Sequence, residues 1–203
     1  MQISSQGLKL IESTEKFEAE PYYCSAHVST VGWGHALTTA TGQIIDYDVF
    51  GEARADQLTR EAMGRMFGKQ HITVAEADEL LTHDLRTYTN EVNRIADART
   101  HQCEFDAMVS MCFNIGVGNF RSSSVARLHV QGARKVGDIS MSRLAQQSRA
   151  KASPTTIQIA FARFAIANGR WTLGLYRRRL AELMVYGGHD AALALRTAWS
   201  FDG

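Results

Sequence analysis

The sequence predicts an α+β fold that is dominated by helices and includes one small β-hairpin. Along most of the chain, apolar residues recur at the three- and four-residue spacing of amphipathic helices. Strand-forming residues gather between residues 22 and 35, and no alternating strand pattern follows residue 50. The chain has 203 residues, 45 % hydrophobic and 21 % charged, which is ordinary for a globular protein with a sizeable core.

A first helix is predicted over residues 5–17, opened by a serine cap. Leu8, Ile11 and Glu15 stand at i, i+3 and i+7, so a helix of this length places them on one face. An ionised carboxylate on the face toward the core is costly unless a cation such as an arginine lies beside it. Glu15 therefore has two open interpretations: a functional acid, or one half of an ordinary salt bridge.

A β-hairpin is predicted directly after this helix, with its turn at residues 25–27. A three-residue turn pairs Cys24 with Val28 and Tyr22 with Thr30. Because side chains alternate along a strand, Cys24 and Thr30 then point to the same side of the hairpin. We expect that side to face the end of the first helix, where Glu15 lies.

The rest of the chain is predicted to be helical. An amphipathic helix over residues 52–67 has an apolar stripe of Ala55, Leu58, Ala62 and Met66. A capping box of Thr73 and Glu76 opens a long helix over about 74–97. Further helices are expected over about 102–115, after a cap at Ser122 or Ser123, over 139–150, from Pro154 to Gly169, and over 173–186.

The domain organisation follows from this order of elements. We expect a single domain over residues 1–203. It would have an N-terminal lobe over about 15–72 with the hairpin and an inserted segment at 38–70, a linking helix over about 74–97, and a helical C-terminal lobe over about 98–203.

Composition excludes several classes of protein. The formal net charge is +1 and there is no long basic run, which argues against nucleic acid as a partner. The run Arg177–Arg179 is interpreted as a solvated helix face. The three cysteines are odd in number and lack metal-ligand spacing, so we expect no disulfide framework, metal or cofactor. Cys112 fits a buried apolar position, which leaves Cys24 as the chemical candidate.

The N-terminus shows no charged region followed by an apolar core, so no signal peptide is expected. No window approaches 18 apolar residues, so no membrane span is expected either. These patterns predict a cytoplasmic chain that needs another factor to reach any substrate beyond the inner membrane.

The candidate residues suit the cleavage of a glycosidic bond. In that reaction an acid protonates the leaving oxygen, while a second group helps water attack the anomeric carbon. Glu15 could supply the acid, and Cys24 and Thr30 could hold a water on the other side of the sugar. Spacing alone does not establish this chemistry, because many chains have these residue types at such intervals.

The stretch GLKLIESTEKFEAEPYYCSAHVSTVGWGHA resembles the phage-type lysozymes, or endolysins, of glycoside hydrolase family 24. The family pattern is Glu, eight residues, Asp or Cys, five residues, Thr, and an aliphatic-Gly-aromatic-Gly-His run. Glu15, Cys24, Thr30 and residues 31–35 fill it here. ITVAEADELLTHDL, FDAMVSMCFNIGVGNFRSSS and GLYRRRLAE extend the likeness over residues 7–188 with gaps. The resemblance implies a lysozyme-like fold with two lobes.

The resemblance also implies roles for the catalytic positions. Glu15 would be the general acid, Thr30 would hold the attacking water, and Cys24 would stand where many relatives have a water-orienting carboxylate. A normal thiol is mostly protonated at pH 7, and the Glu15 carboxylate would raise the pKa of the Cys24 thiol further. We therefore expect Cys24 to position water with inversion at the anomeric centre, whereas attack by a thiolate would retain configuration.

Other positions carry over by the same resemblance. Phe113, Asn114 and Ser123 would line the substrate cleft. His35 is expected to be structural, its ring tied to a carboxylate such as Asp84. Three departures stand out: His27 where the family usually has a turn glycine, a longer segment at 38–70, and Phe164 in place of an expected tryptophan.

The implied function is that of an endolysin muramidase, which hydrolyses the β-1,4 bond between N-acetylmuramic acid and N-acetylglucosamine and so lyses the host cell. The implied setting is a monomer that is held in the host cytoplasm until a holin gives it access to peptidoglycan in the periplasm. Two alternatives stay open: a non-catalytic peptidoglycan-binding module, and a bacteriocin-type effector on the same scaffold.

Overall fold

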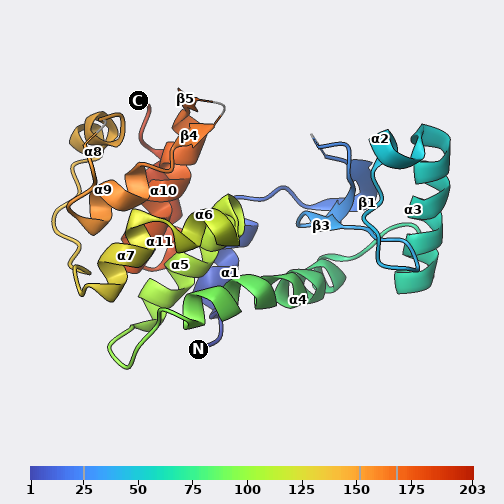
Figure 1. The fold of residues 1–203 in the computed structure, drawn as a ribbon, viewed down its shortest axis with the longest axis horizontal. Helices are drawn as coiled ribbons and strands as arrows, with labels where there is room; N and C mark the ends of the chain where they lie inside the picture. Colours follow the sequence, from blue (N-terminus) through green and yellow to red (C-terminus); the bar gives the residue numbers. More distant parts are fainter. Residues whose placement is uncertain (25, 151, 168) are drawn as a thin grey trace. The chain divides into compact units, whose positions relative to one another are not determined.

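The computed structural model describes residues 1–24, 26–150, 152–167 and 169–203, which form two compact units (Figure 1). Residues 15–84 are called the sheet unit here, and residues 1–14 with 85–203 are called the helical unit. The boundary between Asp84 and Leu85 falls inside one long helix, α4 (Val74–Asn93). The predicted fold class, α+β and mainly helical, is confirmed.

The sheet unit contains a three-stranded antiparallel sheet in the order β1-β2-β3. Its strands are β1 (Glu18–Tyr23), β2 (Ser29–Gly32) and β3 (His35–Ala36). Tyr22 pairs with Thr30, and the N–H of Cys24 donates to the carbonyl of Val28 at 3.0 Å. The predicted register of the hairpin is therefore confirmed, although residue 25 of its predicted turn lies outside the described residues.

The core of the sheet unit is built by the segment that follows the sheet. This segment forms α2 (Tyr47–Phe50) and α3 (Glu52–Phe67), as predicted for residues 52–67. One face of α3 packs on the sheet side chains, and the shared core consists of Val31, Leu37, Ile45, Ala55, Leu58, Ala62, Met63, Ile72 and Ala77. Met66 was predicted to belong to this stripe, but it is 37 % exposed, and Phe67 packs against the core in its place.

The end of β2 requires a glycine, which is Gly32. Its φ of 66° lies in the left-handed region, and a Cβ built on it would come within 3.0 Å of the Cβ of Ala77. Glycine therefore lets β2 turn sharply while α4 lies close against it.

The helical unit is organised around α5 (Gln102–Ile115), the helix predicted at 102–115, which packs against α1 and α10 (Figure 1). Its other helices are α1 (Ser5–Glu12), the second half of α4, α6 (Val117–Arg121), α7 (Ser124–Val130), α8 (Met141–Ser148), α9 (Ile157–Ala162), α10 (Leu173–Tyr186) and α11 (Ala191–Trp199). Among the described residues, none of the helices has the length and apolar character required to cross a membrane.

The first helix is shorter than predicted. It ends at Glu12, and Ser13 is its C-terminal cap. Both the N–H and the hydroxyl of Thr14 donate to the carbonyl of Ile11, at 2.9 and 2.8 Å, so these bonds satisfy the helix end and stop its extension. The prediction of a helix to residue 17 is wrong, and Glu15 follows the helix instead of lying on its inner face.

Two predictions in the C-terminal part are also wrong. The helix predicted to run to Gly169 ends at Ala162. The strands β4 (Ile166–Ala167) and β5 (Arg170–Trp171) then pair in a second small sheet, although no strand was predicted after residue 50. Each of these strands has two residues, which is too short to show a period of two in the sequence.

Two residues of the arginine run on α10, Arg178 and Arg179, are buried, so the prediction of a solvated helix face is wrong for them. Arg179 is fully buried, and its Nη2 lies 2.7 Å from Glu182 Oε1, which also accepts a hydrogen bond from the Ser110 hydroxyl at 2.9 Å. Burial lowers the pKa of Arg179 to about 10, while the charge of Glu182 opposes that change. Arg178 is also buried, with Nε 3.5 Å from the same carboxylate oxygen. Glu182 thus compensates positive charge in the middle of the helical unit.

Replacing Glu182 with glutamine should lower the free energy of unfolding by about 3 kcal/mol, because it leaves a buried arginine without its counter-charge. Urea denaturation followed by circular dichroism measures this. Asp202→Asn is the matched control, since Asp202 is 94 % exposed and pairs with Arg177 at the surface. Equal losses in the two variants would contradict a special role for the buried pair.

Candidate active site

Cys24 and Thr30 are brought together by the β1–β2 hairpin. Thr30 lies on β2, is 4 % exposed, and its hydroxyl lies 2.9 Å from the carbonyl of Val28. Cys24 directly follows β1 and is half-buried. Since Tyr22 is paired with Thr30 and Cys24 with Val28, the alternation of side chains places Cys24 and Thr30 on one face.

The thiol of Cys24 is more acidic than an ordinary cysteine. Burial raises its pKa, but hydrogen bonds from the backbone N–H groups of Ala26 and Val28 and from the Thr30 hydroxyl together lower it below the usual value. The expectation of a raised pKa for this thiol is therefore wrong. The tight turn directs backbone N–H groups toward the sulfur, and such donors stabilise a thiolate.

The hydroxyl of Thr30 has one proton and two groups that can receive it. One is the carbonyl of Val28 at 2.9 Å, and the other is the sulfur of Cys24, whose pKa this hydroxyl helps to lower. With a thiol at Cys24, the hydroxyl oxygen can accept the S–H while donating to Val28. With a thiolate, its proton can turn to the sulfur. The pair can therefore adjust to either protonation state of Cys24.

Glu15 lies between α1 and β1 and is half-buried. One link between Glu15 and the hairpin passes through Tyr22. Burial raises the pKa of the Tyr22 hydroxyl, and the negative charges of Cys24, Glu18 and Glu15 raise it further. Tyr22 is thus in the electrostatic field of both Cys24 and Glu15, which places all three in one part of the sheet unit.

The residues that follow β2 are fixed to α4 by two polar contacts. The indole N–H of Trp33 donates to Asp78 Oδ1 at 2.8 Å. His35 Nδ1 lies 2.7 Å from Asp84 Oδ2, which is the partner that the sequence suggested for it. Both contacts hold β3 and the turn before it against α4. The structural role of His35 and Asp84 stays a prediction, and this geometry agrees with it.

The three predicted substrate-binding residues all lie in the helical unit. The ring of Phe113 packs edge-on against Tyr88 with centroids 5.3 Å apart, and the exposed Asn114 accepts a hydrogen bond from Arg179 at 3.1 Å. Ser123 is 3 % exposed, and its hydroxyl caps α7 by accepting from the N–H of Ala126 at 3.0 Å. Their contact with substrate stays a prediction.

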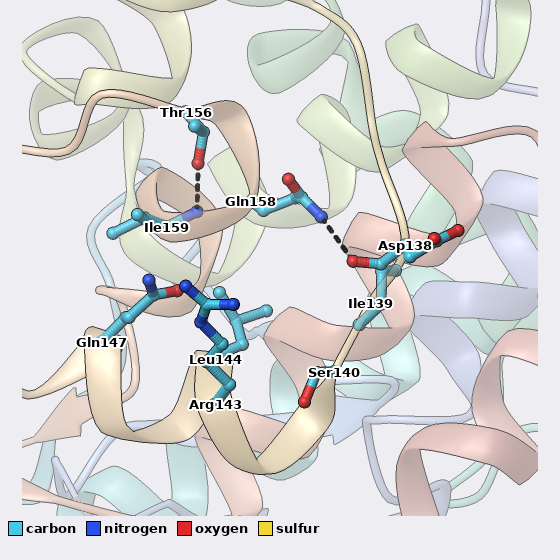
Figure 2. Close-up of a pocket in the computed structure, with 9 residues that line it drawn as sticks. All are labelled: Asp138, Ile139, Ser140, Arg143, Leu144, Gln147, Thr156, Gln158 and Ile159. Atoms are coloured by element: carbon cyan, nitrogen blue, oxygen red, sulfur yellow. Dashed lines mark hydrogen bonds between the residues drawn. The ribbon is translucent and has the colours of Figure 1, made fainter.

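The pockets of the helical unit include three that are lined entirely by its described residues. One of about 480 Å³ lies between α8 and α9, where Arg143, Gln147 and Gln158 line it and the Gln158 amide donates to the main-chain oxygen of Asp138 at 3.3 Å (Figure 2). A second, of about 590 Å³, lies beside residues 135–141. A third, of about 260 Å³, includes Ser123 and Phe164. None of the three is lined by Glu15, Cys24 or Thr30, so pocket size does not point to the chemistry.

Within residues 1–24, 26–150, 152–167 and 169–203, no three His, Cys, Asp or Glu side chains gather in a way that could hold a metal ion.

The fold and the hairpin site define a lysozyme-type hydrolase scaffold, and comparison with known proteins gives the family. The model of the phage lysozyme family matches residues 12–138, which is more than half of the chain and includes Glu15, Cys24 and Thr30. The chain belongs to the phage lysozyme family. The helices α8 to α11 lie beyond the matched segment.

Relatives named as endolysins agree with this assignment, and a solved structure shares the fold. The chain is 30 % identical to the endolysin of Bacillus phage PZA over 62 % of its own length, and to the endolysin of Salmonella phage P22 over 63 %. These alignments span 39 % and 72 % of the two relatives. Its fold is similar to that of an endolysin from the Escherichia coli O157:H7 phage FAHEc1, with a TM-score of 0.62, 24 % identity, and coverage of 92 % of this chain and 93 % of the other.

The acidity of Cys24 can be measured by alkylation with iodoacetamide across a pH series, with each cysteine-containing peptide read by mass spectrometry. We expect the midpoint for Cys24 to lie below about 8.5, the value of a free cysteine. Thr30→Val should move it upward, because one donor to the sulfur is lost. Cys103 is the internal reference, since burial raises its pKa. A Cys24 midpoint at or above that of Cys103 would contradict the assignment.

Proposed function

We propose that this chain is a muramidase that hydrolyses the β-1,4 bond between N-acetylmuramic acid and N-acetylglucosamine in peptidoglycan. The observation that carries the proposal is the hairpin register, which puts Cys24 and Thr30 on one face within the segment that matches the phage lysozyme family. Its relatives are named endolysins, which fits an enzyme that acts on the bacterial cell wall.

The proposed reaction divides the chemistry between three side chains. Glu15 donates a proton to the glycosidic oxygen as the bond to the anomeric carbon breaks. Water attacks that carbon from the opposite side, held by the Thr30 hydroxyl and the Cys24 sulfur, and its proton passes to solvent water as the new bond forms, while Glu15 regains a proton from solvent. The lowered pKa of Cys24 supports a sulfur that accepts a hydrogen bond from this water.

Glu15→Gln should abolish the release of reducing ends from purified peptidoglycan while leaving the far-ultraviolet circular dichroism unchanged, because an amide of the same shape cannot donate the proton. Glu20→Gln is the matched control, since Glu20 is an exposed carboxylate on β1. Substantial activity in Glu15→Gln would overturn the assignment of the acid. If the wild type binds peptidoglycan and releases no reducing ends, the chain is a binding module instead.

The stereochemistry of the product separates the two roles open to Cys24. If Cys24 positions water, the reaction inverts the centre and the α-anomer is released first. If a thiolate attacks, a covalent intermediate forms and the β-anomer is released. We expect the α-anomer in proton NMR spectra recorded within the first minutes of digestion. Initial release of the β-anomer would assign the sulfur as a nucleophile.

Finer parts of the proposal rest on the sequence resemblance. They are membership of glycoside hydrolase family 24, a single lysozyme-like domain, contacts to the sugar from Phe113, Asn114 and Ser123, and action as a monomer. The same resemblance suggests an enzyme held in the host cytoplasm until a holin opens a route to the periplasmic cell wall.

A further inference from the structure

The face of the hairpin opposite Cys24 and Thr30 is held by α3. Tyr23 and Ser29 are cross-strand partners on that face. The Tyr23 hydroxyl donates to Asp56 Oδ1 at 2.8 Å, and the Thr59 hydroxyl donates to the Ser29 hydroxyl at 2.8 Å. Asp56 and Thr59 are three residues apart on α3 and therefore share one helix face. One pair of helix residues thus holds one pair of strand residues.

These two contacts belong to one connected group. Burial raises the pKa of the Tyr23 hydroxyl, the hydrogen bond to Asp56 raises it further, and a hydrogen bond with Thr59 lowers it. Tyr23 is therefore linked to both residues of α3, and Thr59 is linked to both strands. Ser29 is 1 % exposed, so this polar group sits inside the unit, where its partners must be matched in position.

The tip of the hairpin is held by α2. His27 has a φ of 62°, in the left-handed region that is sterically unfavourable for residues other than glycine. Its ring stacks on Tyr47 with centroids 4.3 Å apart, and its Nδ1 lies 2.7 Å from Asp48 Oδ2. The N–H of Tyr47 also donates to the carbonyl of His27 at 3.1 Å. These contacts offset the strained backbone at His27.

Each hairpin residue that contacts α2 or α3 is adjacent in sequence to a residue that forms the candidate site. Tyr23 precedes Cys24, Ser29 precedes Thr30, and His27 lies between Ala26 and Val28, whose N–H groups bind the Cys24 sulfur. Because neighbouring side chains on a strand point to opposite faces, fixing one face fixes the position of the other. A slip of one residue would exchange the two faces.

We propose that Asp56 and Thr59 of α3, with Tyr47 and Asp48 at α2, are positioning residues that hold the hairpin so that Cys24 and Thr30 share a hydrogen bond and face the substrate. This inference rests on the proposed muramidase activity for its catalytic consequence. It also assigns a role to the long segment at 38–70. Through α2 and α3, this segment contacts the hairpin away from Cys24 and Thr30 and so fixes the positions of these two side chains.

The test compares Thr59→Val and Asp56→Asn with the control Glu61→Gln. Glu61 lies on the same helix, half-exposed, and interacts with Arg54 and Gln57 instead of the sheet. Three quantities are measured: the pH midpoint of Cys24 alkylation, kcat and KM on peptidoglycan fragments, and the melting temperature. Thr59→Ser, which keeps the hydroxyl, is the rescue variant.

We expect Thr59→Val and Asp56→Asn to move the Cys24 midpoint upward and to lower kcat by about tenfold or more with little change in KM, since a misplacement of about 1 Å can cost up to a hundredfold. Thr59→Ser and Glu61→Gln should resemble the wild type. Variants that melt earlier but keep the wild-type midpoint and kcat would overturn the proposal, because they would show a structural role alone.

Two further outcomes keep the inference separate from the proposed function. If the wild type lacks muramidase activity, the proposed function fails, while the alkylation midpoints still decide whether α3 positions Cys24. If Thr59→Val does not fold, Asp48→Asn provides the test at an exposed position, where Asp48 is 64 % exposed. It should move the Cys24 midpoint in the same direction by a smaller amount, and an unchanged midpoint would overturn the proposal.

Discussion

The antiparallel register of the hairpin is the constraint on which the candidate site depends. Pairing Tyr22 with Thr30 decides which side chains share a face, and the N–H of Cys24 reaching Val28 decides how tightly the turn closes. Tight closure directs backbone N–H groups at the sulfur and makes the thiol more acidic. The hairpin is in turn contacted on its other face by α3 and at its tip by α2, so the positions of the candidate site residues depend on helices outside that site.

The two units bury polar groups in different ways. In the helical unit, charge is compensated by charge: Glu182 faces two arginines with Ser110 as a further donor. In the sheet unit, hydroxyl groups link helix and strand at positions that face the core. An ion pair of this kind tolerates no missing partner. A chain of hydroxyls fixes orientation instead, because each proton must be directed to one acceptor.

The sequence predicted most of the elements because helical periodicity and capping signals are local. The capping box of Thr73 and Glu76 and the long helices on either side of residue 100 were recognisable in this way. The end of α1 was not, because Thr14 stops the helix through its own hydrogen bonds to Ile11 while the apolar spacing continues to Glu15. The burial of Arg179 depends on Ser110 and Glu182 meeting it in space. The contacts of Asp56 and Thr59 could not be predicted for the same reason, since nothing in the sequence of their own helix indicates Tyr23 and Ser29 as partners.

The division of the chain has a consequence for its order of synthesis. The sheet unit is one continuous stretch, so its core can close soon after residue 84 has left the ribosome. The N-terminal segment of the helical unit belongs with residues made much later: Ser4 bonds to Asp106, and the Gln6 side chain accepts from the N–H of Ala191 at 2.7 Å. The helix α1 therefore reaches its final contacts only after α11 has been made. Cys24 and Thr30 can therefore be in place within the sheet unit before α1 has met the later helices of its own unit.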